Sequence, residues 1–372
     1  MGGRTPGDYP KNLGEFMRRF PDERSCQRYL VATRWPDGFR CRCGSDKAGV
    51  LWERGVWQCH GCRRQTSVTA ETVLHRSKLP LTAWFVTAYL MTSLKPGISA
   101  LQLGRQLGIS YEAAWLMLHK LRRAMVNPDR TLLTGEVEVD ETWVGGKQAG
   151  LKGGRQRAGR KALLVAVAVE RRTKETPPGA PASKSRTYLG RLRLEIIPDA
   201  IGDTLRDFIT RNVADGSTIV SDAWPAYRSL PATFTHQPAS QAAMKRAGIE
   251  PDAVPCVHRV ISNLKTWLRG THHGVGADHL DHYLNEYVFR FNRRFYPMAG
   301  FATLLGLGTV LPHTPASSIF ALLAASGTRI RGRSTGLTST RFSVEINQSP
   351  TLGAAKQAIE AMLDEIGDQN GA

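Results

Sequence analysis

The spacing of hydrophobic positions changes in character along the chain. Between Leu79 and Met125 apolar residues recur at helical spacing, which predicts a helix over LTAWFVTAYLMTSL and two shorter helices after it. Beyond Pro128 the pattern is typical of strands: GEVEVDETW alternates, KALLVAVAVE is a continuous apolar run, and RTYLGRLRLEII follows. A helix over DAIGDTLRDFITRNVADG and a fourth strand in STIVSDAWPAY complete an order that indicates an α/β or α+β domain.

These changes of pattern divide the chain into five parts. An N-terminal helical segment occupies residues 1–38, a cysteine-rich segment residues 39–75, and a helical region residues 76–128. The strand-rich domain is expected over residues 131–298, and residues 299–372 form a tail that we expect to be partly flexible.

Charge indicates the class of partner. The chain has 50 Lys and Arg against 32 Asp and Glu, a net charge of +18, and nucleic acid is the commonest partner of such a basic protein. An anionic membrane is the rival, but the most apolar stretch, residues 301–325, is interrupted by glycine and proline and does not predict a membrane span. The first residues lack the apolar core of a secretory signal, so we expect a cytoplasmic protein.

Cysteines are concentrated near the N-terminus. Four of the six fall within 22 residues as two close pairs, Cys41 with Cys43 and Cys59 with Cys62. Without an export signal this predicts a metal site rather than disulfides, and the spacing is nearly that of a four-cysteine zinc ribbon. Zn²⁺ would be structural, because four ligands leave no open position. The first pair is one residue short of the usual spacing, so His60 or Cys26 is an alternative ligand.

A helix-turn-helix motif is the hypothesis for GISALQLGRQLGISYEAAWLMLHKLRRAM. Ser99 and Ser110 are placed to cap its two helices, which are separated by Gly108, Ile109 and Ser110. An ordinary helical hairpin is the alternative. Three basic residues of the second helix are expected to face DNA phosphates: Lys120, Arg122 and Arg123.

Two aspartates end predicted strands. Valines alternate with carboxylates in GEVEVDE, so one face of that strand should be core and the other should carry Glu136, Glu138 and Asp140. Asp222 ends the strand STIVSD. Aspartates at the ends of neighbouring strands are hard-oxygen ligands suited to Mg²⁺, and such a site can promote in-line phosphoryl displacement. For either aspartate alone, a turn or cap role is the alternative.

The motifs together resemble those of bacterial insertion-sequence transposases with an N-terminal zinc ribbon and a DDE-type, integrase-like domain. The resemblance covers roughly residues 15–310 and rests on the cysteine segment, GEVEVDETWVGGK, SDAWPAY, HRVISNLKTWLRGTHHG and HLDHYLNEYVFRFNRR. It implies a ribonuclease H-like catalytic domain and cleavage and strand transfer at terminal inverted repeats, dependent on Mg²⁺ or Mn²⁺. Asp140 and Asp222 match the first two acids of the family. Double-stranded DNA is the implied partner, and we expect at least a homodimer because two ends must be joined.

The third catalytic position departs from the family, because no acid lies between Asp252 and Asp278. His258 follows Asp222 at a separation close to that of the family, and Lys265, seven residues later, shares its helix face after about 700° of rotation. The resemblance implies that this lysine contacts phosphate. Asn263, about 140° from His258 around a helix, is the rival.

Glu286 is a weaker candidate for that position, since an ion pair with Arg290 explains it more simply. Arg290, Arg293 and Arg294 are expected to line a DNA path. The alternative to an active transposase is a zinc-ribbon and helix-turn-helix DNA-binding protein whose catalysis is impaired by the missing acid.

Overall fold

The computed structural model describes residues 10–126, 130–145, 162–173, 187–239, 246 and 254–310. All of them belong to one compact unit, Met1–His313. None of the described helices is long and apolar enough to cross a membrane.

Helices from both ends of this unit share one hydrophobic core. They are α1 (Leu13–Arg19), α2 (Glu23–Arg34), α3 (Leu81–Ser93), α4 (Ala100–Leu107), α5 (Tyr111–Ala124) and α10 (Pro297–Val310). Phe301 of α10 packs edge-on against Phe16 of α1 and Phe85 of α3, with ring centroids 5.6 and 5.8 Å apart. Residues 299–310 of the expected tail therefore belong to a helix that completes the N-terminal core.

Helices α4 and α5 follow the predicted two-helix pattern. The Ser99 hydroxyl accepts the Gln102 N–H and the Ser110 hydroxyl accepts the Ala113 N–H, so both predicted caps are confirmed. The helices approach closely at Gly104, where an added Cβ would lie 3.0 Å from the Ile109 carbonyl oxygen. A larger residue there would push the two helices apart.

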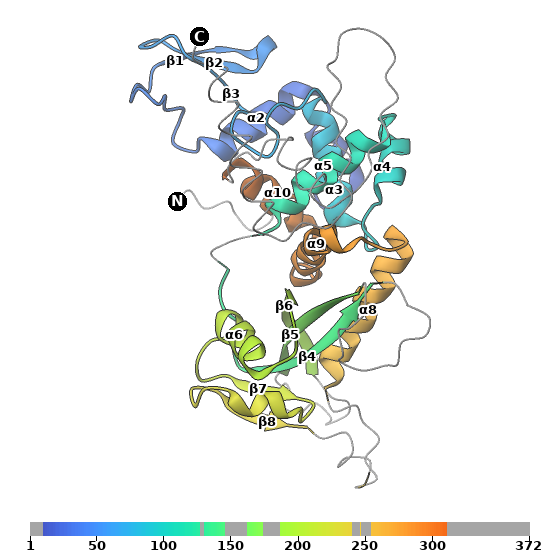
Figure 1. Cartoon of the computed structure of the whole chain (residues 1–372). Coiled ribbons are helices and arrows are strands. Elements are labelled where there is room, and N and C mark those ends of the chain that lie inside the picture. Colours follow the sequence, from blue (N-terminus) through green and yellow to red (C-terminus); the bar gives the residue numbers. More distant parts are fainter. Residues whose placement is uncertain are drawn as a thin grey trace, which may run out of the picture. The chain divides into compact units, whose positions relative to one another are not determined.

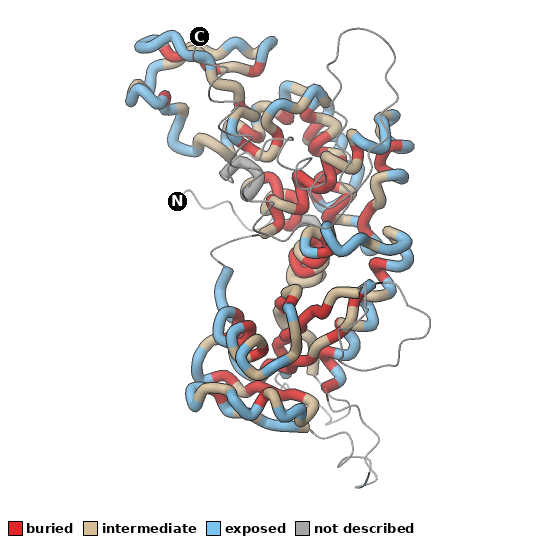
Figure 2. Tube along the Cα trace, viewed as in Figure 1, coloured by how far each residue is buried: buried red, intermediate tan, exposed pale blue. Residues whose placement is uncertain are grey.

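The cysteine-rich segment forms a small antiparallel sheet. Its strands, in the order β1-β2-β3, are β1 (Ala48–Leu51), β2 (Val56–Cys59) and β3 (Gln65–Ser67), with the short helix η1 (Trp52–Arg54) between the first two. Trp57 packs against Trp35 and Trp52 at centroid distances of 5.0 and 5.7 Å. Figure 2 colours most of this segment as exposed or intermediate, in contrast to α3 and α5. An aromatic cluster alone is a small core, which is why such modules commonly depend on a metal.

A mixed five-stranded sheet forms the strand-rich part. Its strands, in the spatial order β6-β5-β4-β7-β8, are β4 (Glu136–Val144), β5 (Leu163–Thr173), β6 (Thr187–Ile197), β7 (Thr218–Ser221) and β8 (Thr235–Pro238). The first three pair antiparallel, whereas β7 runs parallel to β4 and β8 parallel to β7. The four predicted strands are confirmed. The sequence analysis missed β8, an edge strand of polar sequence, THQP.

Helices cover both faces of this sheet (Figure 1). They are α6 (Gly202–Asn212), α8 (Pro255–His272) and α9 (Leu280–Asn292), with the short helices η2 (Pro225–Ser229) and η3 (Ala277–His279). Along β5, Val165 and Val167 lie in the core with α8 and α9, while Ala166 and Ala168 lie in the core with α6. Burial on both faces explains why β5 is a continuous apolar run in the sequence.

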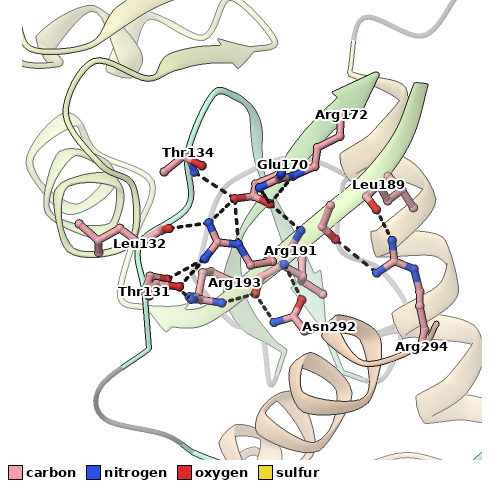
Figure 3. A network of polar contacts seen from close by, with 12 residues as sticks. Thr131, Leu132, Thr134, Glu170, Arg172, Leu189, Arg191, Arg193, Asn292 and Arg294 are labelled. Carbon is pink, nitrogen blue, oxygen red and sulfur yellow. Dashed lines mark hydrogen bonds and ion pairs between the residues drawn. The ribbon is translucent and has the colours of Figure 1, made fainter. Parts of the chain in front are cut away.

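A polar network fixes the chain where it enters the sheet (Figure 3). The buried Glu170 carboxylate accepts a hydrogen bond from the backbone N–H of Thr134 at 3.0 Å. It also accepts one from the backbone N–H of Arg191 and one from the Arg191 guanidinium. Arg191 and Arg193 donate in turn to the carbonyl oxygen of Thr131. Burial raises the pKa of Glu170, but the hydrogen bonds from Arg191 and Thr134 outweigh that effect, so the pKa is lowered. The network therefore fixes residues 131–134, the segment just before β4.

The end of α9 covers the edge strand β6, whose free backbone groups would otherwise be available for pairing. The Asn292 side chain accepts the Leu192 N–H at 2.7 Å and donates to the Leu192 carbonyl oxygen at 3.2 Å. Arg294 donates to the carbonyl oxygens of Leu189 and Gly190.

A buried ion pair joins α5 to α9. Arg122 Nε lies 2.8 Å from Glu286 Oε2, and the two side chains are 1% and 0% exposed. Arg290 lies 3.5 Å from the other Glu286 oxygen and donates to the carbonyl oxygens of Leu94 and Lys95, just after α3. The pair predicted between Glu286 and Arg290 is confirmed, and Glu286 is a structural residue with two cationic partners.

Candidate active site and cysteine cluster

Asp140 and Asp222 come together because β4 and β7 are parallel neighbours. The register pairs Glu138 with Val220, and its extension by two residues places Asp140 opposite Asp222. Asp222 follows the last residue of β7, where Ala223 adopts a left-handed backbone conformation (φ 57°) and the Trp224 N–H donates to Asp222 Oδ1 at 3.2 Å. Asp140 is nearly buried and its Oδ1 accepts the Glu141 N–H at 2.8 Å.

His258 completes this group from the first turn of α8. Its Nε2 lies 3.2 Å from Asp140 Oδ2, and about half of the imidazole remains exposed. Lys265 lies two turns further along the same face, where burial lowers its pKa and the Asp140 charge opposes that effect. Asn263 is exposed on α8. Of the two rivals for the third position, His258 is the one that contacts a predicted catalytic acid.

Glu138 positions α8 against the sheet. Its side chain is fully buried, and Oε2 accepts the backbone N–H groups of Cys256 at 2.7 Å and Val257 at 3.0 Å. A carboxylate at a helix N-terminus satisfies donors that have no partner within the helix and complements the helix dipole. Val137 and Val139 lie in the core on one face of β4, as predicted, and α8 covers the face that carries Glu138 and Asp140. The alternating pattern could not reveal this covering helix.

Tyr227 is buried close to the carboxylates of Glu141, Asp140 and Asp222. Its hydroxyl donates to Glu141 Oε1 at 3.0 Å. Its pKa is raised well above its ordinary value, first by burial and then by the charges of Glu141, Asp140 and Asp222. The sequence analysis missed both Tyr227 and Glu141. Successive residues of a strand point to opposite faces, so Glu141 must lie on the face opposite to Asp140. A carboxylate on that core face needs a buried hydrogen-bond partner, and this was the available signal.

The structure places two of the predicted DNA-contacting residues of α5 inside the protein. Lys120 is 8% exposed, and its Nζ donates to the His75 carbonyl oxygen at 2.9 Å. Arg122 is held in its buried ion pair. Both basic groups are therefore used in contacts within the protein in this conformation. Arg123, in the last turn of α5, remains partly exposed.

The arginines at the end of α9 serve internal contacts. Arg290 and Arg294 donate to the backbone carbonyls described above, and Arg293 lies over the Phe289 ring at 3.9 Å and donates to the Phe289 carbonyl oxygen. All three are half-buried. Each of the three therefore donates at least one hydrogen bond within the protein.

The four predicted cysteines form a cluster suited to a metal ion. Their sulfurs all lie within 4.8 Å of one another, with Cys41 and Cys62 at 3.5 Å and Cys43 and Cys59 at 3.6 Å. Four thiolates around Zn²⁺ with bonds of about 2.3 Å would lie about 3.8 Å apart, so the residues fit this ion. A backbone hydrogen bond from Cys62 is the main cause that lowers the pKa of Cys59 to about 6.

The shortened first pair is therefore compatible with a four-cysteine cluster. Neither of the alternative ligands, His60 and Cys26, belongs to the group, and Cys26 is fully buried in the helical core. Among the described residues no other three His, Cys, Asp or Glu side chains have their ligand atoms gathered this closely in this conformation.

The chain combines a four-cysteine cluster, a helical region and a mixed five-stranded sheet with aspartates at two adjacent strand ends. Two family models match the chain and together cover more than half of it: the transposase zinc-ribbon domain at residues 21–65 and the ISXO2-like transposase domain at residues 132–292. The chain belongs to this family of DDE-type transposases with an N-terminal zinc ribbon. Comparison with curated proteins gives no match.

Proposed function

We propose that this protein is a DNA transposase that binds terminal inverted repeats and catalyses metal-dependent strand cleavage and strand transfer. The observation that carries the proposal is the contact between His258 and Asp140 beside Asp222, in a chain of this family. The strand order β6-β5-β4-β7-β8, with three antiparallel strands followed by two parallel ones, supports a ribonuclease H-like catalytic domain.

Asp140, Asp222 and His258 are the residues that we propose hold the catalytic divalent ion. Carboxylate oxygens fit Mg²⁺ or Mn²⁺, and imidazole fits Mn²⁺ better than Mg²⁺. The bound ions would activate the nucleophile and stabilise the leaving oxygen of an in-line displacement. Glu138 accepts the first backbone N–H groups of α8 and thereby fixes the position of His258. Lys265 is placed to bind a phosphate near the scissile bond.

DNA binding is assigned to the zinc ribbon and to a helix-turn-helix formed by α4 and α5. The close approach at Gly104, the two serine caps and the net charge of +18 support this assignment. Arg105 of α4 is exposed and Arg123 of α5 partly so, and they replace the buried Lys120 and Arg122 as phosphate-contacting candidates. Two protein copies would be needed to hold the two DNA ends.

A metal titration of DNA-end cleavage tests the role of His258. We expect His258→Ala to lose at least about 100-fold in rate, as removal of a catalytic group typically does, and His258→Glu to regain activity and shift the preference from Mn²⁺ toward Mg²⁺. Asn263→Ala, a substitution on the same helix, serves as the matched control and should retain activity.

Unchanged cleavage by His258→Ala would remove this residue from the site. If the wild-type protein binds the ends but nicks them in neither metal, the alternative of a catalytically impaired DNA-binding protein holds. That alternative is favoured by one observation, the absence of an acid at the third position.

A further inference from the structure

Trp224 is an exposed indole beside the aspartate pair. It lies two residues after Asp222, on the turn that leads from β7 into η2, and 37% of it is exposed. It belongs to none of the hydrophobic cores of the described residues, whereas Tyr227, three residues later, is fully buried. The exposed part of this indole can contact a ligand beside Asp222.

The indole is held relative to the catalytic carboxylate. The Trp224 backbone N–H donates to Asp222 Oδ1 at 3.2 Å, and its ring Nε1 donates to the Ala200 carbonyl oxygen at 3.4 Å. The left-handed conformation of Ala223 turns the chain between them. The bond to Ala200 fixes the indole against the segment that leads into α6, where Ile201 is 56% exposed.

A DNA strand combines a phosphate, which the divalent ion proposed at the aspartates would bind, with flat bases that can contact the indole. Stacking on aromatic side chains is the usual way in which proteins hold unpaired bases, and it tolerates any base sequence. A base within a duplex has both faces covered by its neighbours, so it must leave the helix to stack on a side chain.

We propose that Trp224 stacks on a nucleobase that is unpaired next to the scissile phosphate. The stacked base would hold the strand end at Asp140 and Asp222 after the duplex opens there. This inference rests on the proposed function, because it takes the substrate to be a DNA end. It makes Trp224 a substrate-contacting residue, and the Trp224 N–H bond to Asp222 does not depend on the side chain.

The test uses a duplex of the terminal repeat with 2-aminopurine at the base flanking the cleavage position, in Ca²⁺ to allow binding without cleavage. Wild-type protein is expected to change the fluorescence of this base. Trp224→Ala should lose that change and cleave on the order of 10-fold more slowly in Mn²⁺, as expected for one lost stacking contact. Trp224→Phe should retain most of both signals.

Two controls separate stacking from folding. Phe295 is 63% exposed in the turn between α9 and α10, so Phe295→Ala removes an aromatic ring away from Asp222 and should leave both signals unchanged. A mismatch at the flanking base removes the cost of opening the pair and should restore part of the cleavage by Trp224→Ala. A folding defect would not respond to the mismatch.

The outcomes distinguish the inference from the proposed function. If wild type cleaves and Trp224→Ala gives the same fluorescence and rate, the stacking role is overturned while the transposase function stands. If the fluorescence depends on Trp224 but wild type cleaves in no metal, the base contact holds and the catalytic proposal fails. If wild type neither cleaves nor changes the fluorescence, both are overturned.

Discussion

Replacement of Glu286 by alanine tests whether this carboxylate is structural or catalytic. Its side chain is 0% exposed and pairs with the 1% exposed Arg122 at 2.8 Å. The substitution leaves the Arg122 guanidinium buried without the carboxylate that pairs with its Nε. Arg122 Nη2 already has no hydrogen-bond partner among the described residues. Removal of one partner of a buried pair costs about 3–5 kcal/mol, and we expect a loss of that size in the free energy of unfolding.

The magnitude is measured by urea unfolding, with a surface pair as the matched control. Arg206 and Asp203 lie 2.9 Å apart on α6, with side chains 38% and 74% exposed, so Asp203→Ala should cost less than about 1 kcal/mol. The double variant Arg122→Met with Glu286→Leu removes both buried charges and should recover most of the loss.

Stability and cleavage together decide the role of Glu286. A variant Glu286→Ala that unfolds at the wild-type urea concentration but no longer cleaves DNA would identify Glu286 as the third acid and displace His258. A variant that is unchanged in both respects would show that the ion pair contributes nothing to stability. Either result would show that this buried ion pair does not stabilise the fold.

Three further predictions follow from the fold. Wild-type protein should carry one Zn²⁺ per chain by elemental analysis, and Cys59→Ser should lose it; a folded, zinc-free wild type contradicts this. Burial lowers the pKa of His272 to about 4 and that of His119 further, from an ordinary 6.5. Between about pH 6.5 and pH 4 the unfolded chain therefore binds more protons than the folded protein. The free energy of unfolding in urea should be highest above about pH 6.5 and fall toward pH 4, and it should fall less steeply in His119→Gln. Glu138→Ala should cost about 2 kcal/mol or more of urea stability by stranding two α8 N–H groups, and Glu138→Gln should cost less.

Much of the secondary structure could be predicted because its signals are local. The strand pattern of residues 136–144 and the serine caps of α4 and α5 depend on residues near in sequence. The cysteine cluster was also predictable, since its ligands are two close pairs. The strand β8 was missed because its polar sequence carries no periodicity and it is held in the sheet by its pairing with β7.

The partners of charged residues could not be predicted, because they come from distant parts of the chain. Arg122 pairs with Glu286, 164 residues away, and a basic residue near a helix end has the same sequence pattern whether it faces solvent or a buried acid. Glu138 meets the N–H of Cys256 across 118 residues. The alternation in β4 correctly identified two faces but could not show that a helix covers the acidic one.

We propose that Asp140 and Asp222 form a metal-dependent DNA-cleaving site. Its most direct test is cleavage of a labelled DNA end by wild type, Asp140→Ala and Asp222→Ala, with and without Mg²⁺ or Mn²⁺. We expect wild type to nick the end only when a metal is added, and both variants to bind the end without nicking it. Cleavage by either variant at the wild-type rate, or none by wild type in either metal, would contradict it.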